Sequence, residues 1–181
     1  MSASIAAATG IERHDVAVVL GSGMSDIARA IGGTDAIPFA DVGLPTGGVA
    51  GHDGAMFAAA VGDLRVLLFA GRVHLHEGFS AVEVGRHVEA AVHAGCDVVV
   101  LTNAAGGISP ELEVGHPCLI SDHINLTGAN PLVGRDGTEA FVDLSDVYDA
   151  GLRASARTVD PALLDGVYAG VLGPSYETPA E

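Results

Sequence analysis

Short apolar segments alternate with helix-like segments along this chain, and that alternation limits the folds open to it. Residues 15–21 (DVAVVLG) have the pattern of a buried strand that ends in a glycine turn, and residues 25–31 (SDIARAI) that of a short helix. The order recurs: we expect a helix in 80–95, two strands around a Gly-Asp turn in 55–72, and further strands in 96–107, 116–126 and 167–173. Strands that alternate with helices predict an α/β fold with a parallel or mixed sheet.

The length of the chain and its lack of an obvious linker favour one domain. Its 181 residues are 49% hydrophobic, which is enough for a substantial core. We therefore expect residues 1–181 to form a single domain in which a central mixed β-sheet is flanked by helices.

Charge and composition narrow the classes of partner. A net charge of −15 disfavours binding to nucleic acid or to anionic membranes, although a local pocket can still hold a small anion. The apolar runs are too short to cross a bilayer, and the first residues lack the pattern of a secretory signal. The two cysteines, Cys96 and Cys118, suggest neither a disulfide framework nor a zinc motif, so we expect a reduced, cytoplasmic protein.

Four predicted strand ends carry polar or glycine-rich sequence. In open α/β sheets ligands bind at the carboxyl ends of strands. The four segments are GSG at 21–23, GRVHLHEG at 71–78, TNAAGG at 102–107 and GPSYETPAE at 173–181. Four such segments at four strand ends predict a ligand site there more strongly than any single segment does.

The segment GRVHLHEG admits two kinds of site. If it is extended, Arg72, His74 and His76 share one face, and Val73, Leu75 and Glu77 lie on the other. The planar fork of an arginine suits phosphate or carboxylate. A metal site would need a third ligand, for which Asp122 and His123 are candidates, and Arg72 on the histidine face would repel the cation. We favour an anion, while a purely structural role stays open for His76.

The other motifs have structural alternatives. Ser22 lies in a glycine turn that lacks the Rossmann and Walker patterns, and Asn103 either orients a ligand or caps a turn. Tyr176 can stack on a flat ring and Glu177 can accept hydrogen bonds from a heterocycle, but a helix that begins at Thr178 would also explain this segment. The remaining histidines are expected on the surface or on helices: His14, His87, His93 and His116.

Taken together, these segments resemble the trimeric purine nucleoside phosphorylases. The matching pieces run through nearly the whole chain from residue 16: VVLGSGM, GGVAGHDG, GRVHLHEG, VVVLTNAAGGISPELEVGHPCLISDHINLTGANPLVG, FVDLSDVYD and GVYAGVLGPSYETPAE. The related methylthioadenosine phosphorylases fit less well in the arginine–histidine and NAAGG segments.

The resemblance implies a phosphate site and a nucleoside site. For phosphate it implies Ser22, His52, Arg72, His74 and the backbone at Ala104. For the nucleoside it implies Tyr176 and Glu177 at the purine, His76 where many members have a sugar-contacting tyrosine, and Phe141 in a neighbouring subunit of a homotrimer. Of these, His74 and Glu177 would have catalytic roles.

The implied reaction is phosphorolysis of inosine or guanosine, or of their deoxy forms, to the free base and (deoxy)ribose 1-phosphate. Inorganic phosphate is a co-substrate, and no metal or organic cofactor is implied. Family members continue past the ETPAE segment with further phosphate and leaving-group contacts. We therefore expect an incomplete member that releases little or no hypoxanthine from inosine. A non-catalytic phosphate- or nucleoside-binding remnant is the alternative, and a metal-dependent hydrolase that uses the HLH segment is a third possibility.

Overall fold

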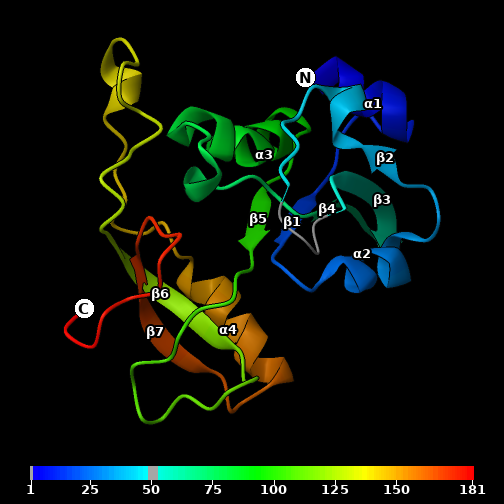
Figure 1. Cartoon of the computed structure of the whole chain (residues 1–181). Coiled ribbons are helices and arrows are strands. Elements are labelled where there is room, and N and C mark those ends of the chain that lie inside the picture. Colours follow the sequence, from blue (N-terminus) through cyan, green and yellow to red (C-terminus); the bar gives the residue numbers. More distant parts are fainter. Residues whose placement is uncertain (1, 49–52) are drawn as a thin grey trace. The chain divides into compact units, whose positions relative to one another are not determined.

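The computed structural model describes residues 2–48 and 53–181, which fold as two compact units (Figure 1). The first unit comprises residues 1–104 and the second residues 105–181.

The first unit is built on a five-stranded mixed sheet. Its strand order is β2 (Ile37–Pro38), β3 (Ala55–Val61), β4 (Leu64–Ala70), β1 (Val16–Leu20) and β5 (Val98–Leu101). Strand β1 runs parallel to both β4 and β5, whereas β3 is antiparallel to β2 and β4. The α/β class and the mixed sheet flanked by helices are thus confirmed, while the single domain over residues 1–181 stays a prediction.

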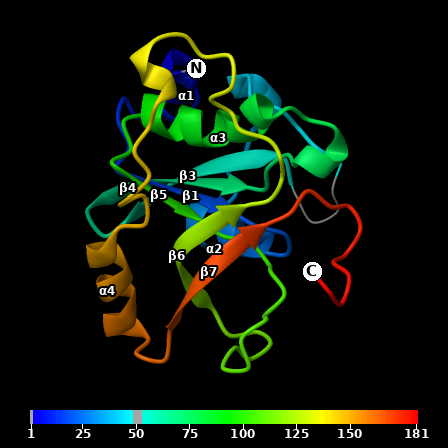
Figure 2. The same ribbon diagram turned by 90° about the vertical axis from the view of Figure 1, so that its left-hand side faces the viewer.

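Both faces of this sheet are covered because its strands alternate their side chains. On one face Ala17, Val19, Met56, Leu67 and Phe69 pack with residues of α1 (Ser2–Thr9), α3 (Ala81–His93) and the 3₁₀ turn η1 (Phe39–Val42). On the other face Leu20, Phe57, Val66, Leu68 and Ala70 pack with Ala28 of α2 (Ser25–Gly32). Figure 2 shows the helices on the two sides of the strands. The period of two along each strand thus gives two apolar layers.

Two histidines are more buried than the sequence predicted. His14, just before β1, is fully buried and belongs to no helix, so its expected place was wrong. His87 does lie on α3, but its ring packs edge-on against Phe39 and Phe69, with centroids 4.8 Å and 5.7 Å away. The reason is its spacing, since His87 lies three and four residues before the buried Ala90 and Ala91 and therefore shares their helix face. By contrast, His93 is exposed on α3, as expected.

The second unit is a parallel two-stranded pair joined through a helix. Strand β6 (Cys118–Asn125) pairs with β7 (Leu164–Gly170), and the connection holds the 3₁₀ turn η3 (Thr138–Ala140) and helix α4 (Ala150–Val159). Arg153 and Arg157 of α4 both bind the Asp165 carboxylate of β7, at 3.1 Å and 2.5 Å. A helical connection is what two parallel strands require.

Most of the expected elements are present, with some differences at their ends. The strand expected in 167–173 is β7, which begins and ends three residues earlier than predicted. Helices α1 and α4 were not predicted. Within the described ranges, no helix is long and apolar enough to span a membrane.

Candidate functional site

Three of the four polar strand ends meet in the first unit. Because β4 and β5 flank β1 in parallel, the segments that follow these strands emerge at the same edge of the sheet. The Gly21 N–H donates to Thr102 Oγ1 at 2.8 Å, and Arg72 Nη1 donates to the Thr102 carbonyl at 2.9 Å. The predicted convergence of these ends is therefore observed, and Thr102 is the residue at which they join.

Gly21 is required by close contact between two of these segments. A Cβ at this position would lie 2.9 Å from the Thr102 carbonyl oxygen and 3.1 Å from Asn103 Cα. Both neighbours are backbone atoms that cannot rotate away. The first glycine of the GSG turn therefore lets the end of β1 pack against the end of β5.

Arg72 is half-buried and reaches past the end of β1 toward β5. Its bond to the Thr102 carbonyl uses one of the five N–H donors of the guanidinium and fixes the direction of the side chain. A guanidinium fixed in this way is suited to bind a tetrahedral anion at the sheet edge.

The segment after Arg72 is not extended, so the predicted separation of faces is wrong. Strand β4 ends at Ala70, and Leu75–Glu77 form the 3₁₀ turn η2. A turn brings residues three apart together, so Glu77 lies beside His74 instead of on the opposite face: His74 Nδ1 is 2.7 Å from Glu77 Oε1. The polar sequence at this strand end favours a turn over continued pairing.

The Glu77 carboxylate is held from three sides and orients His74. Its Oε1 accepts the His74 N–H at 2.9 Å, and its Oε2 accepts the Gly48 N–H at 2.9 Å. Burial alone would raise the pKa of Glu77, but the hydrogen bonds from His74 and Gly48 outweigh it and leave that pKa lowered. An ionised Glu77 beside Nδ1 fixes the orientation of the His74 ring.

The other predicted residues of this unit have different surroundings. The His76 ring stacks on that of His74, with centroids 5.0 Å apart and planes inclined by 23°. Ser22 is exposed in the turn between β1 and α2. The Ala104 carbonyl accepts from Asn103 Nδ2 at 3.1 Å. His52 lies outside the described residues.

The purine-side candidates belong to the second unit. Tyr176 is 95% exposed and Phe141 is 88% exposed, and Glu177 is also exposed. The Thr178 N–H donates to Glu181 Oε2 at 2.7 Å, and the Glu181 N–H donates to Thr178 Oγ1 at 3.4 Å. These reciprocal bonds are those of a capping box, in agreement with the alternative that this segment begins a helical turn at Thr178.

The proposed metal ligands Asp122 and His123 also belong to the second unit. There the His123 N–H donates to Asp122 Oδ1 at 2.7 Å, and His123 Nδ1 is 3.1 Å from the Tyr148 hydroxyl. Burial, with the nearby Asp122 and Tyr168, raises the pKa of Tyr148. These contacts form a local cluster around β6.

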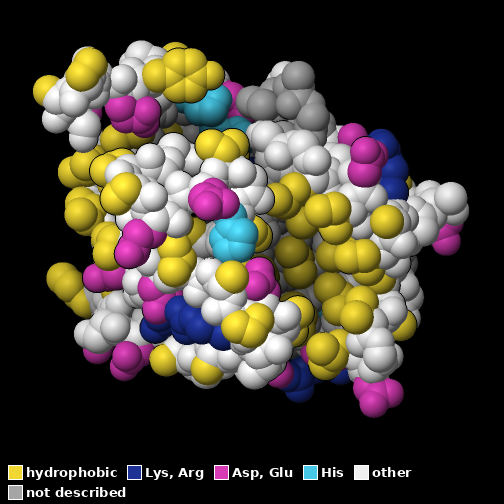
Figure 3. All heavy atoms as spheres, turned by 90° about the horizontal axis from the view of Figure 1, so that it is seen from below, with side chains coloured by type: hydrophobic (Ala, Val, Ile, Leu, Met, Phe, Trp, Pro, Cys, Tyr) yellow, Lys and Arg dark blue, Asp and Glu magenta, His cyan; other side chains and the backbone are white. Residues whose placement is uncertain are grey.

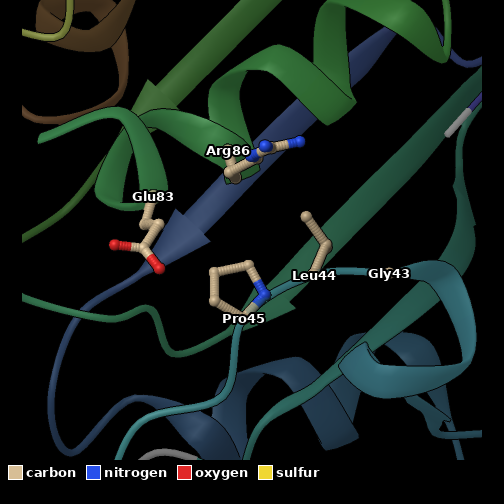
Figure 4. Close-up of a pocket in the computed structure, with 5 residues that line it drawn as sticks. All are labelled: Gly43, Leu44, Pro45, Glu83 and Arg86. Atoms are coloured by element: carbon tan, nitrogen blue, oxygen red, sulfur yellow. The ribbon is translucent and has the colours of Figure 1, made fainter. Parts of the chain in front are cut away.

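A separate hollow of about 410 Å³ lies beside α3 in the first unit. Figure 4 shows Glu83 and Arg86 on the helix opposite Leu44 and Pro45. With Gly43, these residues make up its lining, so the hollow is distinct from the sheet-edge site.

Sequence reasoning missed two residues of the sheet-edge site. Thr102 was within a quoted motif but had no assigned role, and Glu77 was placed on the wrong face. The available signal for Glu77 was its position three residues after His74, next to Gly78, which is the spacing of a capped turn.

Comparisons with known proteins identify the class. The family model of the phosphorylase superfamily matches residues 15–181, and the chain belongs to that superfamily. Purine nucleoside phosphorylase of Mycobacterium tuberculosis is 51% identical over 98% of this chain, and that of a Cellulomonas species is 44% identical, also over 98%. The chain spans 65% of the length of the mycobacterial relative.

The fold agrees with this assignment. A purine nucleoside phosphorylase from Schistosoma mansoni, solved in complex with inosine, superposes with a TM-score of 0.85 at 30% identity, covering 99% of this chain and 67% of that one. A purine nucleoside phosphorylase in complex with ribose 1-phosphate gives a TM-score of 0.86 at 31% identity, covering 99% of this chain and 71% of the other.

Proposed function

We propose that this chain functions as a purine nucleoside phosphorylase, which converts inosine, guanosine or their deoxy forms and phosphate into the free purine and (deoxy)ribose 1-phosphate. The observation that carries the proposal is the sheet edge where Arg72 is fixed on Thr102 and His74 is oriented by Glu77. The names of the relatives support the same reaction.

In this proposal the sheet edge binds the nucleophile. Phosphate is held by Ser22, Arg72, His74, His52 and the backbone at Ala104, below C1′ of the ribose. A phosphate oxygen forms the bond to C1′ while the bond from C1′ to the purine nitrogen breaks. The purine leaves with the electron pair and takes up a proton. The bound anion stabilises the cationic character that the sugar develops, and fixed donors pay no reorganisation cost during the step.

The resemblance of the sequence to the purine nucleoside phosphorylases assigns the purine side in this proposal. Tyr176 stacks on the base, and the Glu177 carboxylate accepts N1–H of a 6-oxopurine, which selects inosine and guanosine over adenosine. His76 lies at the sugar. Phe141 completes the site of a neighbouring copy in a homotrimer. No metal or organic cofactor takes part, and the reaction takes place in the cytoplasm.

Phosphate binding by the sheet edge is the first test. We expect calorimetry to detect phosphate binding to the wild-type chain and Arg72→Gln to weaken it about 10- to 100-fold, because a charged hydrogen bond is lost. Arg135→Gln, which changes an exposed arginine of the second unit, serves as the matched control and should bind phosphate normally. Equal binding by Arg72→Gln and wild type would reject the phosphate site.

Turnover is the second test. Hypoxanthine release from inosine and phosphate, assayed on the same preparations, measures how much activity this chain has; we expect little release, and any release detected with wild type should be lost in Arg72→Gln. Phosphate and hypoxanthine binding without any release would instead support the alternative, a non-catalytic binding form of the family.

A further inference from the structure

The turn η2 brings together three side chains whose combination suits a metal ion. His74, His76 and Glu77 each offer one ligand atom, and these atoms all lie within 4.8 Å of one another. His74 and Glu77 are half-buried and His76 is exposed. Because the chain turns here, the third ligand comes from the same segment as the two histidines.

Two of the three groups are already held in place. His74 Nδ1 lies 2.7 Å from Glu77 Oε1, and the Gly48 N–H holds the other carboxylate oxygen at 2.9 Å. The packing around Glu77 is tight, since a Cβ at Gly47 would lie 2.6 Å from its Oε2. A site whose ligands are preorganised loses less conformational entropy when an ion binds.

Part of the remaining adjustment falls on the exposed group. The rings of His74 and His76 stack at 5.0 Å and are inclined by only 23°. Ligand atoms around a tetrahedral zinc ion lie about 3.3 Å apart, given zinc–nitrogen bonds of about 2.0–2.1 Å. The His74–Glu77 pair has to open from 2.7 Å, and His76, which is exposed, can approach by rotating its side chain.

The donor set selects the kind of ion. Two imidazoles and one carboxylate are the ligands of many three-residue zinc sites, whereas calcium and magnesium prefer oxygen alone. Arg72, which the extended arrangement would place on the histidine face, instead directs Nη1 to the Thr102 carbonyl. The turn also brings the Glu77 carboxylate beside His74, on the face where the extended arrangement had only Arg72 and the histidines, and its negative charge offsets that of Arg72.

We propose that His74, His76 and Glu77 form a binding site for Zn²⁺ or a similar transition-metal ion, with water completing the coordination. The ion is an inhibitor and not a cofactor, because it replaces the hydrogen bond between His74 and Glu77 that orients the His74 ring for phosphate. This consequence rests on the proposed function, whereas the binding site itself does not.

Titration with zinc tests the site directly. We expect calorimetry with ZnCl₂ in a phosphate-free buffer to show one ion bound per chain, and His76→Tyr and Glu77→Gln each to weaken it at least about 10-fold. Even the loss of an outer-shell partner of a metal costs 10- to 100-fold. His93→Gln removes an exposed histidine of α3 and is the matched control, with unchanged affinity expected. Circular dichroism verifies that each variant is folded.

The outcomes separate this proposal from the proposed function. Equal zinc affinity of wild type and His76→Tyr, or no binding at all, would overturn the metal site. Co²⁺ gives an independent readout, since the intense visible absorption of tetrahedral cobalt should appear with wild type and be lost with His76→Tyr. Sulfate, which has the shape of phosphate and keeps zinc in solution, should weaken zinc binding. If zinc binding requires His76 but sulfate has no effect, the metal site stands and the role of His74 in anion binding fails.

Discussion

The two units of the chain are stabilised differently, although both contain parallel strands joined through helices. Among the described residues, every buried hydrophobic side chain lies between Ile5 and Ala94, in the first unit. In the second unit Ile124 of β6 is 53% exposed and Val167 of β7 is 60% exposed. Figure 3 shows apolar side chains exposed over much of the face that it views.

The difference follows from how each sheet is covered. The five-stranded sheet has apolar layers on two faces, whereas the described contacts of the second unit include several polar ones, such as the two arginines of α4 on Asp165. Burial of apolar surface is the main stabilising term in folding, and exposed ion pairs add little. The first unit therefore holds most of the folding free energy, and the predictions below test that statement.

The largest expected effect is that of a cavity in the first unit. Phe69→Ala should lower the free energy of unfolding by about 3–5 kcal/mol, because Phe69 of β4 is fully buried against Phe39 of η1 and His87 of α3. Ile124→Ala, the matched change in the second unit, should cost at most about 1 kcal/mol, since half of that side chain is already in water. Urea unfolding followed by circular dichroism measures both.

Phe69→Leu keeps this comparison testable if the alanine variant does not fold, because a smaller cavity costs less. A loss at Ile124 that equals the loss at Phe69 would contradict the assignment of the core to the first unit.

Helix caps give the next comparison. Ser80 caps α3 and accepts the Glu83 N–H at 3.3 Å, while Asp149 caps α4 and accepts the Leu152 N–H at 2.7 Å. Ser80→Ala and Asp149→Ala should each cost about 1 kcal/mol. Helix α4 has no buried residue among those described, so we expect Asp149→Ala to fray it. Packed α3 should stay helical in Ser80→Ala.

Amide hydrogen exchange distinguishes the two cases. Protection should fall along the first turns of α4 in Asp149→Ala but not along α3 in Ser80→Ala. Equal loss of protection in both helices would show that packing does not hold α3.

Sequence periodicity predicted the first unit better than the second. The strands β1, β3 and β4 are apolar runs bounded by glycine turns, so their places could be predicted. Helix α1 is nearly all alanine and serine and has no apolar stripe to detect. Helix α4 does have a short stripe, Leu152, Ala156 and Val159, which the sequence reading overlooked. The contacts of α4 with Asp165 come from β7, which lies beyond the range of local patterns.

The candidate site was predictable in place but not in detail. Strand order brings the ends of β1, β4 and β5 together, and motif positions alone predicted that meeting point. The turn at Leu75–Glu77 depends on hydrogen bonds from His74 and Gly48 to one carboxylate, and the Gly48 bond spans 29 residues. The alternation of side chains along a strand, which is a local pattern, could not reveal this turn.

The loss of stability at low pH should also differ between the units, but by less. Three hydrogen bonds from Arg65, two from its guanidinium and one from its backbone N–H, hold the pKa of Asp15 far below its ordinary range. Burial would raise the pKa of Asp165, but Arg157 and Arg153 outweigh it and lower that pKa. A lowered carboxylate pKa stabilises the fold above the ordinary value of about 4, and that contribution is lost as the pH falls through the folded-state value.

Unfolding midpoints in urea, measured between about pH 5 and pH 2.5, check this effect. Asp15→Asn should flatten the loss of stability toward acid, and Asp165→Asn should flatten it less, since the shift at Asp15 is the larger one. A steeper contribution from Asp165 would place the stronger ion pair in the second unit.

The smallest effect concerns thiol reactivity and leaves stability nearly unchanged. Burial, together with the carboxylates of Asp15 and Asp97, raises the pKa of Cys96 in the first unit to about 11. In a Cys118→Ser variant, alkylation of Cys96 should therefore be slow at pH 8 and accelerate about tenfold per pH unit toward pH 11, because the thiolate is the reactive form. In the Cys96→Ser variant the only thiol is Cys118, so its alkylation rate describes the second unit. Alkylation of both variants in urea gives the rate for each thiol in the unfolded chain. A Cys96 rate that levels off near pH 9 would mean that water reaches this thiol, and the tight packing assigned to the first unit would then not extend to the start of β5.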